Sequence, residues 1–322
     1  MIYQSISGQL ILIATIFMLP TLSFSSNYFS ISNYSNTTCG KNAAYCEGSR
    51  TFADGSRYEG EFRYGQPDGK GKMKWKDGSR YEGQFRKGIR HGQGEQSFRD
   101  GSSYVGEFEN GFMQGQGLFT FACGQEYHGN FYKDKMDGKG VIHFTNGESY
   151  SGDWIEELPD GSGAYTLVDG TRYLVDYRSG SRHGEGTVAF PTGDLLTTQW
   201  KKGNPVKKAR FQFQNGDQLV GKWDNFSLFD DLKYTLQSGV TISGNIATLE
   251  SVLERQGTNL TALRQNLALV YYAIALELKM VKQNKKASKV LDQAQARLHV
   301  SDPLYQLIEK QKQGFSTKSS IN

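Results

Sequence analysis

Residues 58–80 read YEGEFRYGQPDGKGKMKWKDGSR, and this stretch decides the fold because the chain repeats its pattern every 23 residues. One aromatic column and one glycine column keep this step without any insertion. The aromatic column is Phe62, Phe85, Phe108, Phe131, Trp154, Tyr177, Trp200 and Trp223, and the glycine column is Gly78, Gly101, Gly124, Gly147, Gly170, Gly193, Gly216 and Gly239. A fixed period of this size indicates stacked copies of one small unit.

Each copy predicts one antiparallel β-hairpin. Apolar or glycine residues alternate with charged ones over 58–62 and over 71–75, which is typical of half-buried strands. The Gly/Pro/Asp-rich residues 64–69 predict a six-residue loop, and Asp77-Gly78 predicts a turn of three or five residues. If the apolar side chains share one face, Phe62 lies opposite Gly71, Gly60 opposite Met73, and Trp75 opposite both Tyr58 and Tyr81.

The copies resemble the MORN repeat (membrane occupation and recognition nexus), whose pattern is Y-x-G-x-[F/W]-x-x-G-x-x-x-G-x-G-x-x-x-[F/W]-x-[D/N]-G. Residues 58–80, 81–103, 104–126, 127–149 and 150–172 fit it well. The copies at 173–195 and 196–218 are weaker, because Val175 and Thr198 replace the strand glycine and Lys207 and Ala209 replace the loop glycines. With a half copy before Tyr58 and a degenerate copy from Leu219, the resemblance covers residues 46–244.

The resemblance implies a mainly β repeat array: an elongated, twisted, single-layer antiparallel sheet with an aromatic-lined groove, of the bacterial type with a signal-like N-terminus and a helical C-terminal region. The family includes scaffolds, dimerisation modules and membrane-attachment proteins. The candidate groove residues are Tyr58, Trp75, Tyr81, Phe98, Tyr104, Phe121, Tyr127, Phe144, Trp154 and Trp200. The alternative is that these rings only pack against one another.

Residues 1–25 resemble a secretory signal peptide, with an apolar stretch over 10–22 and a small-x-small site ending at Ser25. Residues 2–9 lack the basic residues of such a segment, so an uncleaved anchor is the alternative. We expect an exported protein of the periplasm or cell envelope. Residues 26–45 predict a linker, and export would favour a disulfide between Cys39 and Cys46 over two free thiols. Cys123 stands at a turn position as a neutral substitution.

The sequence changes character after Gly244, where glycine nearly vanishes and Leu, Ala, Gln and Lys dominate. Helical spacing of apolar residues predicts helices at 246–256, 259–282, 285–298 and 303–313 within a helical region, 245–314, before a disordered tail, 315–322. The predicted apolar faces are Leu263, Leu267, Val270, Tyr271, Ile274 and Leu278, then Ala287, Leu291, Ala294 and Leu298. We interpret this region as a cap on the array; an independent peptide-binding module similar to one tetratricopeptide hairpin is the alternative.

Charge alternates in blocks along the array. Residues 50–99 carry twelve Lys/Arg and seven Asp/Glu, whereas residues 100–170 carry three and twelve. Such blocks favour a protein partner or head-to-tail self-association. Binding of the basic blocks to anionic lipid is an alternative, and a glycan-binding aromatic surface is another. The acidic block argues against nucleic acid.

No group of residues indicates catalysis, a metal, a cofactor or a small-molecule substrate. His91 and His183 share one phase of the repeat, and the Asp-Gly pairs recur because the turns need them. The many G-x-G pairs precede strands and lack the Lys-Ser/Thr of a phosphate loop. The sequence therefore predicts a non-enzymatic interaction scaffold.

Overall fold

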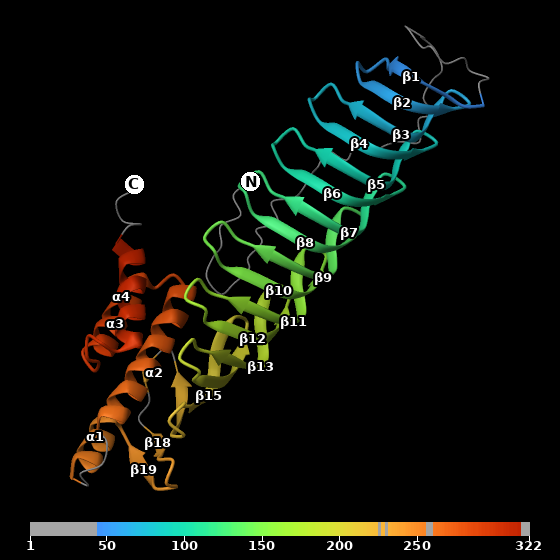
Figure 1. Ribbon diagram of the computed structural model, residues 1–322. Helices are drawn as coiled ribbons and strands as arrows, with labels where there is room; N and C mark the ends of the chain where they lie inside the picture. The colour runs from blue at the N-terminus through green and yellow to red at the C-terminus, as the bar shows by residue number, and fades with distance from the viewer. Residues whose placement is uncertain (1–43, 225–226, 229–230, 256–259, 317–322) are drawn as a thin grey trace. The chain divides into compact units, whose positions relative to one another are not determined.

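The structure is a computed structural model that describes residues 44–224, 227–228, 231–255 and 260–316. The chain divides into two compact units, with described residues 44–158 in the first and 159–316 in the second. The described strands form one antiparallel sheet of 19 strands, followed by four helices (Figure 1). The predicted fold class is confirmed.

In the first unit, consecutive strands pair as antiparallel hairpins. The strands are β1 (Cys46–Thr51), β2 (Arg57–Arg63), β3 (Gln66–Lys74), β4 (Arg80–Arg86), β5 (Ile89–Ser97), β6 (Ser103–Glu109), β7 (Phe112–Thr120), β8 (Glu126–Tyr132), β9 (Lys135–His143) and β10 (Ser149–Ile155). The tip of each hairpin is a two-residue turn, for example Tyr64-Gly65 between β2 and β3.

The predicted register within the hairpin was wrong by two residues. Tyr58 lies opposite Met73 rather than Trp75, and Gly60 lies opposite Gly71. The predicted six-residue loop does not exist, because the ladder shifts between Gly60 and Phe62 and the additional residues enter a bulge in β3. Phe62 therefore lies opposite Pro67, not Gly71.

The turn between copies has five residues, 75–79, which confirms the predicted odd length. Arg80 pairs with Lys74, and Tyr81 lies opposite Met73, so the predicted pair of Trp75 with Tyr81 was wrong. Asp77 closes the turn by accepting hydrogen bonds from the backbone amide and the hydroxyl of Ser79 (2.9 and 2.6 Å). These hydrogen bonds lower the pKa of Asp77.

Four tyrosines each lie over a pair of glycines on one face of the sheet, which we call the inner face: Tyr58, Tyr81, Tyr104 and Tyr127. A Cβ atom added at Gly71 would come within 2.3 Å of the Tyr58 hydroxyl oxygen. The hydroxyl donates to the Glu61 carbonyl oxygen at 2.8 Å. Glycine is therefore required here because the ring occupies the space of a side chain.

The tyrosines also join neighbouring copies. Tyr58 packs edge-on against Phe62 of its own copy at 5.0 Å and against Phe85 of the next at 4.9 Å. Tyr81, Tyr104 and Tyr127 repeat the same two contacts. Such edge-to-face contacts contribute roughly 0.5–1.5 kcal/mol each beyond burial, so the core of the first unit is a ladder of equal steps.

The second unit continues the hairpins and adds the helices. Its strands are β11 (Leu158–Thr166), β12 (Arg172–Arg178), β13 (Ser181–Ala189), β14 (Leu195–Lys201), β15 (Asn204–Gln212), β16 (Gln218–Asp224), β17 (Ser227–Leu228), β18 (Leu232–Thr235) and β19 (Thr241–Gly244). Its helices are α1 (Ile246–Arg255), α2 (Leu260–Met280), α3 (Asn284–Gln295) and α4 (Pro303–Ser316). The four helices lie where the sequence predicts them, although α3 ends at Gln295 rather than at 298 and α4 extends past residue 313.

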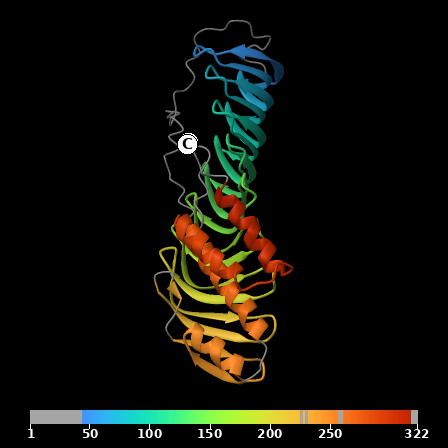
Figure 2. The ribbon, with the colours of Figure 1, turned by 90° about the vertical axis from the view of Figure 1, so that its left-hand side faces the viewer.

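Helix α2 runs across the strands of the second unit (Figure 2). It is buried on most sides, including five of the six residues of its predicted apolar face; the sixth, Tyr271, is half-buried. Helix α3 packs on α2, and Ala287, Leu291 and Ala294 of its predicted apolar face are buried. Leu298, the fourth residue of that predicted face, lies beyond the end of α3 and is half-buried. Helix α1 packs on β19, the last strand, so the helical region both ends the sheet and covers a face of it.

Candidate protein-binding surfaces

The ten candidate groove residues lie along the aromatic ladder and its turns. Eight of them are buried, and only Trp75 and Phe98 are half-buried. Trp154 and Trp200 expose 1% and 2% of their surface, which leaves little ring face for stacking on a sugar. The burial shows the packing role of these rings, whereas their binding role stays a prediction.

Five consecutive hairpin tips of the first unit each expose one large apolar side chain. We call this row the tip ridge, and its members are Tyr64 (67% exposed), Ile89 (49%), Phe112 (45%), Tyr132 (51%) and Ile155 (54%). In the second unit, the tips between β12 and β13 and between β14 and β15 carry Arg178, Ser179, Lys201 and Lys202 instead. Among the hairpin tips that the structure describes, the ridge is thus confined to the first unit.

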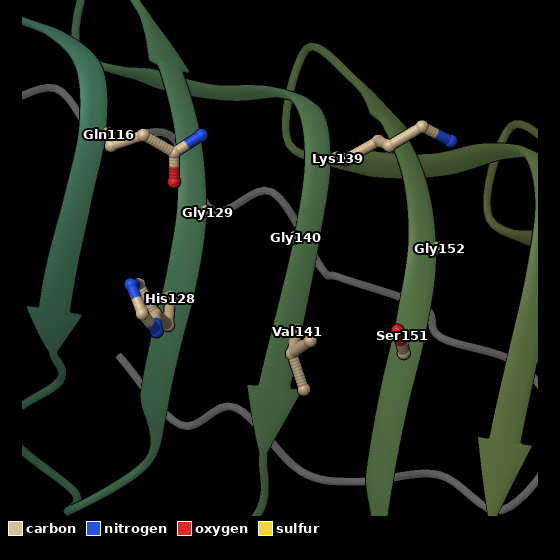
Figure 3. A pocket seen from close by; sticks show the side chains of 8 residues that line it. All are labelled: Gln116, His128, Gly129, Lys139, Gly140, Val141, Ser151 and Gly152. Atoms are coloured by element: carbon tan, nitrogen blue, oxygen red, sulfur yellow. The ribbon is translucent and has the colours of Figure 1, made fainter.

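A shallow pocket of about 340 Å³ lies on the outer face of the sheet in the first unit, which is the face opposite the inner face of the tyrosines (Figure 3). Its lining residues are Gln116, His128, Gly129, Lys139, Gly140, Val141, Ser151 and Gly152. Lys139 already binds Asp153 at 2.9 Å, and Gln116 donates to Asn130. The lining holds no nucleophile paired with a base, so the pocket does not form a recognisable catalytic site.

A buried ion pair of the second unit joins the sheet to α2. The two terminal nitrogens of Arg182, in β13, donate to the two carboxylate oxygens of Glu277, both at 2.9 Å. The Arg182 side chain is 1% exposed and that of Glu277 is 2% exposed. Burial alone would lower the pKa of Arg182, but the adjacent carboxylate outweighs it and the pKa is raised.

Two further contacts hold α2 on the sheet. Near its start, Asn266 donates to the hydroxyl oxygen of Tyr234 at 2.8 Å and to Asp217 at 3.3 Å. Nearer its end, Tyr272 donates to the carboxylate of Asp169, which belongs to a hairpin turn. The helix is therefore held at three places along the strands that it crosses.

Sequence reasoning missed these contacts. Arg182 and Glu277 are 95 residues apart, and neither stands out in composition. One signal was present: Arg90 and Arg182 share a phase of the repeat that otherwise holds Pro67, Met113, Met136, Pro159 and Pro205. A charged residue in an apolar column indicates a special partner.

Only one of the two cysteines of the predicted disulfide lies among the described residues. Cys46 opens β1, whereas Cys39 lies outside the described residues, so the disulfide stays a prediction. Cys123 is free and exposed in its turn. The signal-like residues 1–25 also lie outside the described part.

Within the described residues, no three or more His, Cys, Asp or Glu side chains come together as metal ligands. A search of the same residues for a helix long and apolar enough to span a membrane found none.

Stacked 23-residue hairpins with one shared ladder define a β-repeat protein. A family model for the MORN repeat matches residues 58–80, 81–103, 104–124, 127–149, 150–172 and 176–195. Residues 58–195 therefore contain six matched MORN repeats. The copy at 196–218, where Thr198 replaces the strand glycine, falls outside the match. MORN repeats suggest a protein-interaction scaffold rather than an enzyme.

Solved structures give only distant likenesses. The TCP10 domain of Danio rerio CPAP is 15% identical, with a TM-score of 0.40, and the match covers 62% of this chain and 94% of that one. The SAS-4 TCP domain of Drosophila melanogaster, solved with a proline-rich motif of Ana2, is 11% identical, with a TM-score of 0.35 and coverage of 48% and 84%. Comparison with curated proteins gave no match.

Proposed function

We propose that the chain is a non-catalytic, exported scaffold of the cell envelope that binds a protein partner along the tip ridge. The observation that carries the proposal is the row of apolar side chains on five consecutive tips, each 45–67% exposed. Soluble monomers rarely expose contiguous apolar patches larger than a few hundred Å², and patches above that size are typical of protein contacts.

The dimensions of the ridge fit a protein interface. Paired strands lie about 4.8 Å apart, so successive tips lie roughly 10 Å apart and five tips span about 40 Å. An interface of standard size buries about 800 Å² on each partner, which a ridge of this length can supply together with the polar residues beside it. Export is supported by the signal-like residues 1–25 alone.

The direct test places a photo-crosslinking amino acid at Phe112 and, in a second variant, at Asn204. Both residues open the second strand of their hairpins, four copies apart, and only Phe112 lies on the tip ridge. We expect a protein partner to crosslink at position 112 and not at 204, in cells of the native host. Crosslinking of the same protein at both positions, or at neither, would contradict the tip ridge as the binding surface.

A variant that removes the ridge completes the test. Ile89→Ser, Phe112→Ser and Ile155→Ser together should abolish the partner crosslink, measured at a position next to the ridge, while the circular dichroism spectrum stays unchanged because these side chains are exposed. Sequencing the N-terminus of the mature protein from fractionated cells tests export. An intact Met1 in the cytoplasmic fraction would contradict it.

A further inference from the structure

Two arginines of the array are built into the sheet in the same way. Arg90, in β5, and Arg182, in β13, lie four copies apart. A terminal nitrogen of Arg90 donates to the Gly111 carbonyl oxygen at 2.6 Å, and that of Arg182 donates to the Gly203 carbonyl oxygen at 2.8 Å. Both glycines belong to the tip of the next hairpin, so the two guanidinium groups have the same anchor.

The two guanidinium groups also contact the same pair of ring positions. Arg90 lies 5.9 Å from the ring of Tyr81 and 5.1 Å from that of Phe108, and Arg182 lies 5.0 Å from Tyr173 and 5.5 Å from Trp200. Cation–π contacts of this kind position a guanidinium without neutralising its charge. The two sites differ in the side chain that accepts a hydrogen bond from the other terminal nitrogen.

Arg182 donates hydrogen bonds to the Glu277 carboxylate of α2, whereas Arg90 donates one to a neutral side-chain amide. The second terminal nitrogen of Arg90 donates to the side-chain oxygen of Gln96 at 2.7 Å, and the corresponding residue near Arg182 is Val188. Among the described residues, no carboxylate oxygen lies within ion-pair distance of Arg90. An arginine in a partly buried, aromatic site is stabilised most by a bidentate carboxylate.

The inner face around Arg90 is also less covered than the face around Arg182. Arg90 is half-buried, as are its neighbour Trp75, 5.9 Å from the guanidinium, and Phe98. Arg182 is 1% exposed because α2 lies over it. The first unit thus has a matching arginine site, and no helix among its described residues covers this site as α2 covers Arg182.

We propose that the inner face of β3 to β6 docks an amphipathic helix of a partner protein that presents a glutamate or aspartate to Arg90, as α2 presents Glu277 to Arg182. The rest of the partner helix is apolar and small where it faces the sheet, like Val270 and Ala273 of α2. The carboxylate displaces the Gln96 amide from Arg90. This inference rests on the proposed scaffold function and names the chemistry of one partner.

The test uses a fluorescein-labelled peptide with the sequence of residues 260–282 and a lysine tail for solubility, and measures its binding to the full chain by anisotropy. A matched peptide carries Glu277→Gln. The protein variants are Arg90→Met, which the array itself uses at Met113 and Met136, and Arg86→Met, an exposed arginine on the preceding strand, as the control.

We expect the wild-type peptide to bind, and Glu277→Gln in the peptide or Arg90→Met in the protein to weaken binding at least about tenfold. The two changes combined should cost no more than either alone, and Arg86→Met should change binding less than about twofold. Absence of binding, an equal affinity of the Gln peptide, or a loss with Arg182→Met but not with Arg90→Met would overturn the proposal. The tip-ridge crosslinks are independent of these results, so the proposed function can survive their failure.

Discussion

Breaking the Arg182–Glu277 pair should destabilise the second unit strongly, and replacing both residues should not. Glu277→Leu leaves the Arg182 guanidinium 1% exposed, with only the Gly203 carbonyl oxygen as acceptor. Removing one partner of a buried pair typically costs about 3–5 kcal/mol, because the other charge stays buried without compensation. Arg182→Met strands the Glu277 carboxylate in the same way and should cost a similar amount.

The double variant Arg182→Met/Glu277→Leu should recover most of this loss. Methionine already occupies the same phase at Met113 and Met136, where it is buried. An apolar replacement of a buried pair is often neutral, so we expect the double variant within about 2 kcal/mol of the wild type, which implies a coupling energy of several kcal/mol.

The assay is urea unfolding followed by far-ultraviolet circular dichroism, with hydrogen exchange of residues 260–280 as the local readout. Both single variants should exchange faster along α2, and the double variant should regain protection. Single variants that cost less than about 1 kcal/mol, or a double variant whose cost is the sum of the two, would refute the reasoning that this pair holds α2 on the sheet.

Three further predictions concern the ladder and the surface. Gly94→Ala should lower the free energy of unfolding by about 1–3 kcal/mol, because the added Cβ would lie 2.3 Å from the Tyr81 hydroxyl oxygen. The control Glu95→Ala, on the outer face, should change that free energy by less than about 0.5 kcal/mol in the same urea titration. Burial raises the pKa of the Tyr81 hydroxyl from 10.0 to about 12, so the unfolded chain loses the hydroxyl proton at a lower pH than the folded chain. The contribution of Tyr81 to the free energy of unfolding is complete below pH 10.0 and falls as the pH rises towards about 12. The urea midpoint should therefore be lower at about pH 11 than at about pH 9. Anionic vesicles should not sediment the protein at about 0.15 M salt, because Lys72 is paired with Glu82 at 2.9 Å and basic and acidic side chains alternate; co-sedimentation that weakens with salt would instead support lipid binding.

The hairpins, their common face and the four helices follow from the sequence, but the register does not. If the apolar side chains share one face, the number of residues between Phe62 and its partner must be even. This expectation is met, because Phe62 lies opposite Pro67. Parity could not show where the additional residues go. Asp68 lies in the bulge, where its carboxylate accepts a hydrogen bond from the backbone amide of Lys87 in the next hairpin.

The candidate site was harder to predict for a physical reason. Aromatic residues dominate the repeat, so periodicity assigns them to a groove, yet rings that pack edge-on against both neighbours become buried. The exposed apolar residues of the tip ridge sit at varying phases, Ile89 and Phe112 at one and Tyr132 and Ile155 at another, and no column reveals them. Long-range partners such as Glu277 have no periodic signal at all.

The joint between copies has a consequence for how such chains change in length. Tyr58 contacts a ring of its own copy and one of the next, and Tyr81 does the same one step along. Removing or duplicating a block of 23 residues therefore recreates every ring contact at the new junction, whereas a block of 22 or 24 would turn each following side chain to the opposite face. Removal or duplication of whole copies can therefore change the length of the array while its internal contacts stay the same.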